Sequence, residues 1–401
     1  MIFNVLFIAD GTISNPILQS QGLPYLFNIS SSSNKAHVLS FENSDIDIER
    51  NPEFNAIFSQ FSKRIDFHFV RINRKSRLPV WTNFILRGLK VIICVNKQFD
   101  IKVLHARSFF PAFLSIIYKT FFKHNVSVIY DNRGLAIDER IFTGELRKNS
   151  IKEKILRGIE RRIFNKCDMM VVVSKAFQNY INISYPEIFN KQNNKMVVIP
   201  NRTMLHMNEQ EIMEAKKNLK GKIICVYNGS AASWQGIDKL YVIFSLIIKE
   251  IPSSSLKIIT YNPEIFRTYI PVSEISSEKL DILKVASSKV HHELAKSTFG
   301  LLFREPGLVT RASSPIKFAE YLASGLPVLL LEGIGDTEEV ILNYGVGVII
   351  RGNNYKDAII EMKTLLKDPD IHEKCIQVAR KEFDIGQSYT QYKSIYQNLT
   401  R

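Results

Sequence analysis

The sequence predicts an α/β protein built from two doubly wound domains. Short apolar runs alternate with longer segments whose apolar residues recur at helical spacing, which is the pattern of parallel sheets covered by helices. The chain has 401 residues, of which 45% are hydrophobic, so it can form two cores. Two such series, separated by a break near residues 201–220, favour two domains over one.

The short apolar runs are the candidate strands. In the first half they are Ile2–Ile8, His37–Phe41, Ile65–Val70, Lys102–His105, Val126–Tyr130, Met169–Val173 and Val197–Ile199. In the second half they are Ile223–Tyr227, Leu256–Thr260, Ile282–Val285, Gly300–Phe303, Val328–Leu331 and Val346–Ile350. We therefore expect an N-terminal domain over 1–205, a second domain over 206–385, and a helix over 386–401 that packs back toward the first domain. Ligands of such sheets bind beyond the carboxyl ends of the strands, so a cleft between the domains is the expected site.

The positive charge of the chain is concentrated in its first half. The net charge is +14, and residues 1–200 hold 28 Lys and Arg against 16 Asp and Glu, a net charge of +12. This asymmetry indicates an anionic partner, which could be phosphate groups, an anionic membrane surface or nucleic acid. The alternative is a basic surface that only contacts solvent.

Two stretches of the first half combine basic and aromatic residues, a composition that suits a membrane surface. One is the apolar segment Leu78–Val95, and the other is Phe109–Lys123. Around the first lie Arg71, Arg74, Lys75, Arg77, Arg87 and Lys90. The alternative is that both are core helices with basic outer faces.

The cysteines and the N-terminus predict a cytoplasmic protein. Cys94, Cys167, Cys225 and Cys375 lie far apart and match no metal-ligand spacing. Cys167 and Cys225 lie in or beside apolar runs, so buried free thiols are expected. The apolar N-terminus meets Asp10 early and lacks a basic start, which favours a strand over a signal peptide. No stretch is long and apolar enough to span a membrane. We expect a cytoplasmic location, peripheral on the inner face of the cytoplasmic membrane.

A short capped helix in the second half has the features of a phosphate site. Ser314 is a suitable N-cap, Pro315 suits the first helical position, and Gly325 suits the left-handed position after the helix. The free N–H groups at its start would attract an anion. Lys317 and Glu320 are three residues apart and share one face, so a diphosphate could bind at the helix start and a ribose at Glu320. The alternative is an ordinary Lys–Glu surface pair.

The run from Ser314 to Val328, SPIKFAEYLASGLPV, resembles the donor-site helix of family 4 glycosyltransferases, which have the GT-B fold of two Rossmann-like domains. The similarity is greatest to the bacterial members that build surface polysaccharides, and it covers nearly the whole chain. Further matching pieces are His105–Ser108, Tyr130–Gly134, Val171–Ser174, Val198–Asn201, Tyr227–Ser230 and Trp234–Gly236.

The resemblance implies a metal-independent transferase that needs no cofactor and moves a sugar from a nucleotide-sugar donor with retention of configuration. It implies that Glu320 binds the ribose and Lys317 the diphosphate, and it makes Lys317 catalytic. The other donor-binding residues that we expect are Ser314, Gly229, Ser230, Gly11, Thr12 and Arg304. Two departures concern charge: Ala312 lies where many members have a glutamate, and Ser230 and Gln235 lie where many have Arg and Lys.

Charged residues at two strand ends of the first domain are candidates for the acceptor side. Asp131 and His105 could relay the acceptor proton, and Arg107 and Arg133 could bind the acceptor. A salt bridge between Asp131 and Arg133 that fixes the loops is the alternative.

The expected function is sugar transfer to a glycan or polyprenyl-diphosphate-linked acceptor in the synthesis of capsule, O-antigen or lipopolysaccharide. Two other functions fit part of the sequence. A nucleotide-sugar 2-epimerase has a similar architecture, and a basic, non-enzymatic binding protein would explain the charge alone. No nucleic-acid motif is present, so we expect no nucleic-acid partner.

Overall fold

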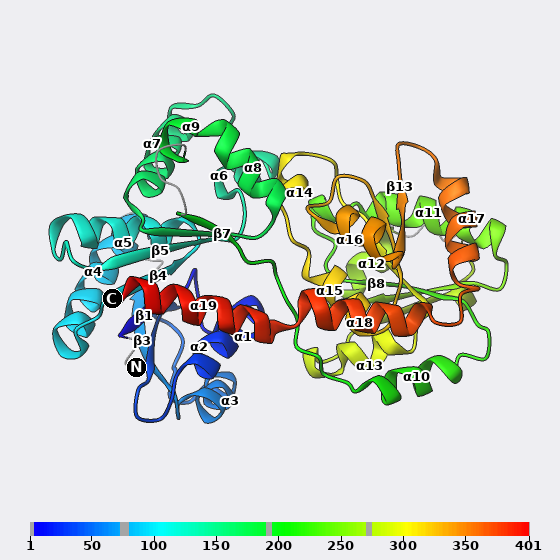
Figure 1. Ribbon diagram of the computed structural model, residues 1–401, viewed down its shortest axis with the longest axis horizontal. Helices are drawn as coiled ribbons and strands as arrows, with labels where there is room; N and C mark the ends of the chain where they lie inside the picture. The colour runs from blue at the N-terminus through cyan, green and yellow to red at the C-terminus, as the bar shows by residue number, and fades with distance from the viewer. Residues whose placement is uncertain (1–3, 73–79, 190–194, 270–274, 401) are drawn as a thin grey trace. The chain divides into compact units, whose positions relative to one another are not determined.

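The computed structural model describes residues 4–72, 80–189, 195–269 and 275–400 (Figure 1). The chain divides into two compact units, Met1–Ile199 with Gly386–Arg401, and Pro200–Ile385. The boundary after Ile199 lies a few residues before the one that we expected at 205.

The first unit contains a sheet of seven parallel strands in the order β3-β2-β1-β4-β5-β6-β7. All seven overlap the runs expected from the sequence. They are β1 (Val5–Ile8), β2 (Ala36–Asn43), β3 (Ile65–Ile72), β4 (Val103–Arg107), β5 (Ser127–Asn132), β6 (Met169–Val172) and β7 (Met196–Val198). Because β1 lies between β2 and β4, the chain reverses its winding direction there, which is the Rossmann-like arrangement.

Helices cover this sheet. The core beside Phe7 and Ala9 is filled from α1, α2 and α3, whereas Leu6 and Ile8 alternate with these residues and are buried toward the other face. α4 and α5 pack against β3, β4 and β5. The helices of this unit are α1 (Pro16–Gln21), α2 (Leu23–Ile29), α3 (Pro52–Phe61), α4 (Val80–Phe99), α5 (Phe109–Phe121), α6 (Ala136–Phe142), α7 (Ile151–Lys166), α8 (Lys175–Ser184), α9 (Pro186–Phe189) and α19 (Ile385–Leu399). α19, drawn in red in Figure 1, lies alongside this sheet.

The second unit contains six parallel strands in the order β10-β9-β8-β11-β12-β13. They are β8 (Ile224–Asn228), β9 (Ser255–Ile259), β10 (Leu280–Leu283), β11 (Phe299–Leu302), β12 (Val328–Leu331) and β13 (Gly347–Ile350). Cys225 and Tyr227 point into a core with α11 (Ile237–Glu250) and α17 (Tyr355–Leu365). Val226, between them, points into a core with α15 (Ile316–Ala323) and α18 (Ile371–Phe383). The sheet is thus covered on both faces, as its continuous apolar strands predict.

Shorter helices complete the second unit. They are α10 (Glu209–Lys217), α12 (Pro263–Tyr269), α13 (Val290–Ala295), α14 (Leu308–Arg311) and α16 (Thr337–Tyr344), with 3₁₀ turns η1 (Ser233–Gln235), η2 (Ser277–Lys279) and η3 (Ser287–Lys289). Within the described parts of the chain, no helix is long and apolar enough to cross a membrane.

The helix α15 ends as predicted but begins differently. Gly325 has φ +67°, and the N–H groups of Gly325 and Leu326 donate to the carbonyls of Leu322 and Tyr321, which is a Schellman motif. At its start, Pro315 occupies the N-cap position and the first helical residue is Ile316. The prediction that Ser314 caps the helix is therefore wrong. Its side chain is engaged elsewhere, as described below.

Gly300 is required by the ring of Tyr321. A Cβ at Gly300 would lie 2.5 Å from Cδ2 of this ring, which is buried against β11. We expect Gly300→Ala to lower the free energy of unfolding by about 1–3 kcal/mol, the usual cost of overpacking a core. Gly158 in α7 is the control, since a Cβ there meets nothing within 4 Å. Gly158→Ala should instead stabilise the protein by about 0.5–1 kcal/mol through helix propensity. Equal effects in chemical denaturation would contradict this assignment.

Candidate functional site

Lys317 lies in the first turn of α15 and is buried, with 8% of its surface exposed. Its ammonium group donates to Gln235 Oε1 at 2.7 Å and to the Tyr227 hydroxyl at 3.1 Å. It also lies 4.4 Å from the centre of the Tyr227 ring. In the described parts of the chain, no carboxylate lies within ion-pair distance of this ammonium. The alternative of an exposed Lys–Glu pair is therefore wrong: a positive charge is enclosed with neutral partners.

A second cation lies close to this ammonium. Burial lowers the pKa of Lys317 well below its usual value, Arg304 lowers it further by charge repulsion, and Glu320 opposes the shift. Arg304 follows β11, and the neighbouring Glu305 N–H donates to the Trp234 carbonyl at 3.0 Å, which holds the turn that carries Gln235 against this strand end. A buried cation that a second cation repels favours a bound anion, because an anion would offset this repulsion.

Glu320 lies one turn further along α15, where its carboxylate accepts a hydrogen bond from Asn228 Nδ2 at 3.0 Å. Burial raises the pKa of Glu320, while Lys317 and the Asn228 hydrogen bond act in the opposite direction. Tyr321 fixes the same strand end, because its hydroxyl accepts from Asn228 N–H at 2.8 Å and donates to the Leu301 carbonyl at 3.2 Å. The carboxylate keeps capacity to accept hydrogen bonds from hydroxyl groups of a ligand.

Gly229 and Ser230 directly follow β8, and Gly229 lies against Lys317. Gly229 has φ +152°, and a Cβ there would lie 2.1 Å from Lys317 Nζ. The Tyr227 hydroxyl, which accepts from Lys317, donates to the Ser230 carbonyl at 2.7 Å. The structure thus brings Lys317, Glu320, Arg304 and Gly229 together at the carboxyl ends of β8 and β11.

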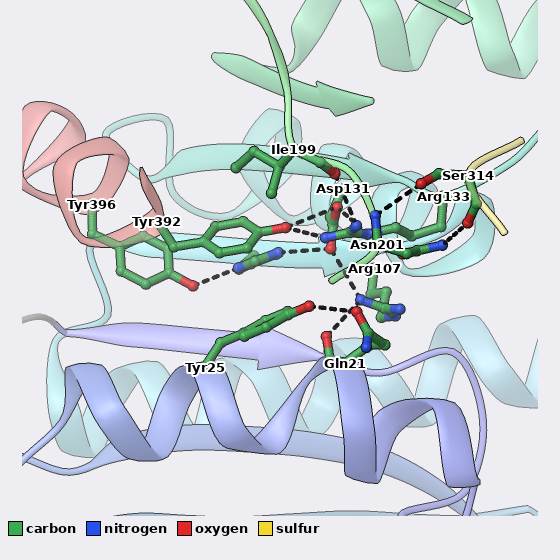
Figure 2. A network of polar contacts seen from close by, with 11 residues as sticks. Gln21, Tyr25, Arg107, Asp131, Arg133, Ile199, Asn201, Ser314, Tyr392 and Tyr396 are labelled. Atoms are coloured by element: carbon green, nitrogen blue, oxygen red, sulfur yellow. Dashed lines mark hydrogen bonds and ion pairs between the residues drawn. The ribbon is translucent and has the colours of Figure 1, made fainter. Parts of the chain in front are cut away.

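Ser314, just before α15, is held by Asn201. The Asn201 N–H donates to Ser314 Oγ at 3.1 Å, and its side-chain amide donates to the Ser314 carbonyl at 2.7 Å (Figure 2). Asn201 therefore orients the loop from which α15 begins. Ser314 remains a candidate donor residue, but its hydroxyl oxygen already accepts one hydrogen bond.

Gly11 and Thr12, the donor residues expected in the first domain, lie in the loop after β1. Thr12 Oγ1 donates to Glu42 Oε2 at 2.5 Å, and the buried Glu42 also accepts from Ile13 N–H and Ser40 Oγ. The Gly11 carbonyl accepts from Phe41 N–H at 2.9 Å. This loop is thus fixed to β2 by a buried carboxylate.

In the first unit, the charged strand ends form one buried network (Figure 2). Asp131 lies 2.7 Å from Arg133 Nε, 3.3 Å from Arg107 Nη1 and 3.3 Å from His105 Nε2. Arg107 also donates to the Gln21 carbonyl, and Arg133 to the Ile199 carbonyl.

Two tyrosines of α19 complete this network. The Tyr392 hydroxyl donates to Asp131 Oδ1 at 3.3 Å and accepts from Arg133. The Tyr396 hydroxyl lies 2.5 Å from His105 Nδ1. Unpaired charges at this depth would be costly, so these contacts fasten the last helix to the first sheet.

The ionisation of this network follows from its geometry. Burial alone would raise the pKa of Asp131, but Arg133, His105 and Arg107 hold it below its ordinary range. Burial lowers the pKa of His105 and outweighs the effect of Asp131. We assign the proton of a neutral His105 to Nε2, facing the carboxylate, so that Nδ1 accepts from Tyr396. Both side chains are enclosed and paired, which favours the salt-bridge role over proton relay.

The basic stretches that we expected at a membrane surface differ from each other. α5 is mainly a core helix, and Phe121 and Phe122 at its end are exposed. On α4, Leu86, Arg87 and Lys90 are exposed. Arg74, Lys75, Arg77 and Leu78 lie outside the described residues.

Sequence reasoning missed four residues that shape the two sites. Tyr227 and Gln235 hold Lys317, Asn228 holds Glu320, and Asn201 holds Ser314. Tyr227 and Asn228 end β8, Gln235 lies in η1, and Asn201 follows β7. All four belong to the short matching pieces of the sequence, and that was the available indication. Among the described residues, no three His, Cys, Asp or Glu side chains gather as a metal site.

Comparison with known proteins establishes the fold. No protein-family model and no curated protein sequence matches the chain. Among solved structures, sucrose-phosphate synthase from Thermosynechococcus elongatus is 12% identical with a TM-score of 0.70, covering 99% of this chain and 98% of that one. Anabaena HepE in complex with UDP is 13% identical with a TM-score of 0.65, covering 99% and 100%. A putative UDP-N-acetylglucosamine 2-epimerase from Listeria monocytogenes is 14% identical with a TM-score of 0.59, covering 100% and 98%. The chain thus has the predicted GT-B fold.

Gly229→Ala should disturb the candidate anion site. The new Cβ would displace the Lys317 ammonium, and an alanine at position 229 would have to adopt an unfavourable φ. We expect binding of pyrophosphate, measured by calorimetry, to weaken about tenfold or more, the value of a lost charge-assisted hydrogen bond. Gly221→Ala is the matched control, since Gly221 has φ +78° but no neighbour within 4 Å of its Cβ. If both variants bind pyrophosphate like the wild type, Gly229 does not shape an anion site.

Proposed function

We propose that this chain is a glycosyltransferase that uses a nucleotide-sugar donor bound by its second unit. The observation that carries the proposal is the buried ammonium of Lys317, which lies near Arg304 and has only neutral hydrogen-bond partners. A diphosphate placed here would also lie one helical turn from Glu320, whose carboxylate could accept the ribose hydroxyls. The UDP bound in the similar HepE structure supports this donor class.

The proposed chemistry requires stabilisation of a leaving group. The bond between the anomeric carbon and the diphosphate oxygen breaks, and an acceptor hydroxyl oxygen bonds to that carbon. Lys317 and Arg304 would stabilise the charge that develops on the diphosphate, so no metal ion is needed in this proposal. Asp131 and His105 are enclosed, so we propose that the departing phosphate oxygen takes the acceptor proton, and that configuration is retained.

We further propose that the acceptor is a glycan or a polyprenyl-diphosphate-linked glycan used for a surface polysaccharide. The motif resemblance across the chain and the net charge of +12 in residues 1–200 support this. A lipid-linked anionic acceptor would require the protein to work at a membrane surface, where a basic first unit is favourable.

Glu320→Ala should abolish donor binding and leave the fold intact. A ligand at 100 times its Kd stabilises a protein by about 2.7 kcal/mol. We expect wild type to show such a thermal shift with one member of a panel of nucleotide-sugars, and the variant to lose it. Glu361→Ala, an exposed change on α17, is the control and should keep the shift. A wild-type response in Glu320→Ala would refute the donor-site assignment.

Donor binding should also take up protons through Lys317. The free protein holds the pKa of this ammonium low, and a bound diphosphate would raise it. Affinity for UDP should therefore be highest below the pKa that Lys317 has in the free protein. It should fall as the pH rises from that value toward the higher pKa that Lys317 has in the complex. Calorimetry in two buffers with different ionisation enthalpies measures this uptake. Lys317→Met should bind more weakly and without uptake, and uptake unchanged in this variant would exclude Lys317 as its source.

A nucleotide-sugar 2-epimerase is the second candidate, because the Listeria structure has the same architecture. An epimerase converts its nucleotide-sugar without an acceptor, whereas a transferase needs one. Incubating the full chain with the stabilising nucleotide-sugar alone, followed by chromatography, separates the two. Formation of an epimeric nucleotide-sugar would replace transfer by epimerisation as the function.

A further inference from the structure

We propose that the outer face of α7, together with the groove between α7 and α8, docks the first unit on an anionic phospholipid bilayer. The proposed function has the protein working at a membrane surface, and this inference, which rests on that proposal, names the surface of the first unit that contacts the membrane. The evidence is a helix face whose composition and contacts suit a bilayer surface. It lies outside the basic stretches that the sequence indicated.

The first observation is an apolar stripe that faces solvent. Ile151 and Ile155 are 78% and 59% exposed. At 3.6 residues per turn they lie one above the other, and the exposed Gly158 continues the same side. On α8, Ile183 is 79% exposed. Folding buries little of these isoleucine side chains, so it stabilises the protein little through them. Contact with the acyl chains of a bilayer would bury them.

The second observation is that cations flank this stripe on both sides. On a helical wheel Lys154 and Arg161 fall to one side, and Lys152 and Lys166 to the other. All four are exposed, and Arg162 lies in line with the isoleucines. Arg161 pairs with Glu187 at 3.0 Å, but both side chains are about half exposed, so this pair is weak. Across the described residues, Lys152, Lys154, Arg162 and Lys166 have no carboxylate partner.

The third observation is that the carboxylates of α7 are used internally. Glu153 and Glu160 both pair with Arg157, at 3.6 and 3.1 Å, and Asp138 of α6 pairs with the same guanidinium at 2.6 Å. Glu160 also accepts from the Tyr185 hydroxyl at 2.6 Å. These carboxylates are thus engaged by Arg157 and Tyr185, and none of them pairs with the exposed lysines of the outer face.

A groove beside the stripe adds room for a headgroup. It has a volume of about 540 Å³ and is lined by residues of α7, of α8 and of the segments next to them. Its charged lining residues are Lys154, Arg157, Arg161 and Glu153, and Glu153 pairs with Arg157. Ile183 adjoins the lining residue Ser184. A lipid phosphate in this groove would meet two cations while the neighbouring isoleucines enter the acyl boundary.

This composition favours a bilayer over nucleic acid. An amphipathic helix that lies in the membrane interface carries Lys and Arg beside its apolar residues, as α7 does. Nucleic acid would use the cations but leave the isoleucines in water. The exposed Leu342 on α16 shows the contrast, because Glu338 and Glu339 lie on the same helix.

Sedimentation with lipid vesicles tests the proposal. The full chain should bind phosphatidylcholine vesicles that contain phosphatidylglycerol, should bind pure phosphatidylcholine weakly, and should dissociate as salt is raised. Ile151→Ser with Ile155→Ser should weaken binding about tenfold or more. Lys152→Gln with Lys154→Gln should weaken it about 25-fold, at about fivefold per basic residue. Val242→Ser with Leu342→Ser, exposed apolar residues of the second unit, is the matched control and should bind like wild type.

Two outcomes would overturn the proposal. One is wild-type vesicle binding by the α7 variants, and the other is binding of a random DNA duplex that depends on the lysines but not on the isoleucines. The thermal shift with the nucleotide-sugar should stay unchanged in the α7 variants, because the proposed donor residues Lys317 and Glu320 lie in the second unit. A chain that binds vesicles through α7 but no nucleotide-sugar would refute the proposed function and leave the docking surface standing.

Discussion

The enclosed ammonium of Lys317 is the constraint around which the second-unit site is arranged. Removing a charge from water is unfavourable, and hydroxyl and amide oxygens compensate only in part. Tyr227 and Gln235 provide those oxygens, and the absence of a side chain at Gly229 provides the space. In the proposed function, a diphosphate would supply the missing negative charge.

The first unit solves a different problem with buried charge. Asp131 has three nitrogen-bearing partners, and α19 contributes Tyr392 and Tyr396 from the end of the chain. A helix that follows the second unit in sequence thereby belongs to the first unit in space. Because Asp131 is paired within the protein, this network serves stability and position. Lys317 differs, since no carboxylate of the described residues lies within ion-pair distance of its ammonium.

Parts of the site prediction failed because other contacts engage the residues concerned. Ser314 has the right chemistry for an N-cap, but Asn201, far away in sequence, engages both its side chain and its carbonyl. α5 has a basic and aromatic composition, yet its aromatic residues mostly fill the core. α7 was not singled out because its isoleucines look like core residues until the neighbouring helices are in place.

The sequence by itself determined the two parallel sheets, since every candidate strand is a short apolar run that becomes a described strand, and it also determined the end of α15 at Gly325. These features depend on neighbouring residues, through apolar periodicity and the φ preference of glycine. Only the tertiary structure decided the partners of Lys317, Glu320 and Asp131. Such partners come from distant strand ends and from α19, and a charge takes its environment from whichever groups the fold brings within a few ångströms.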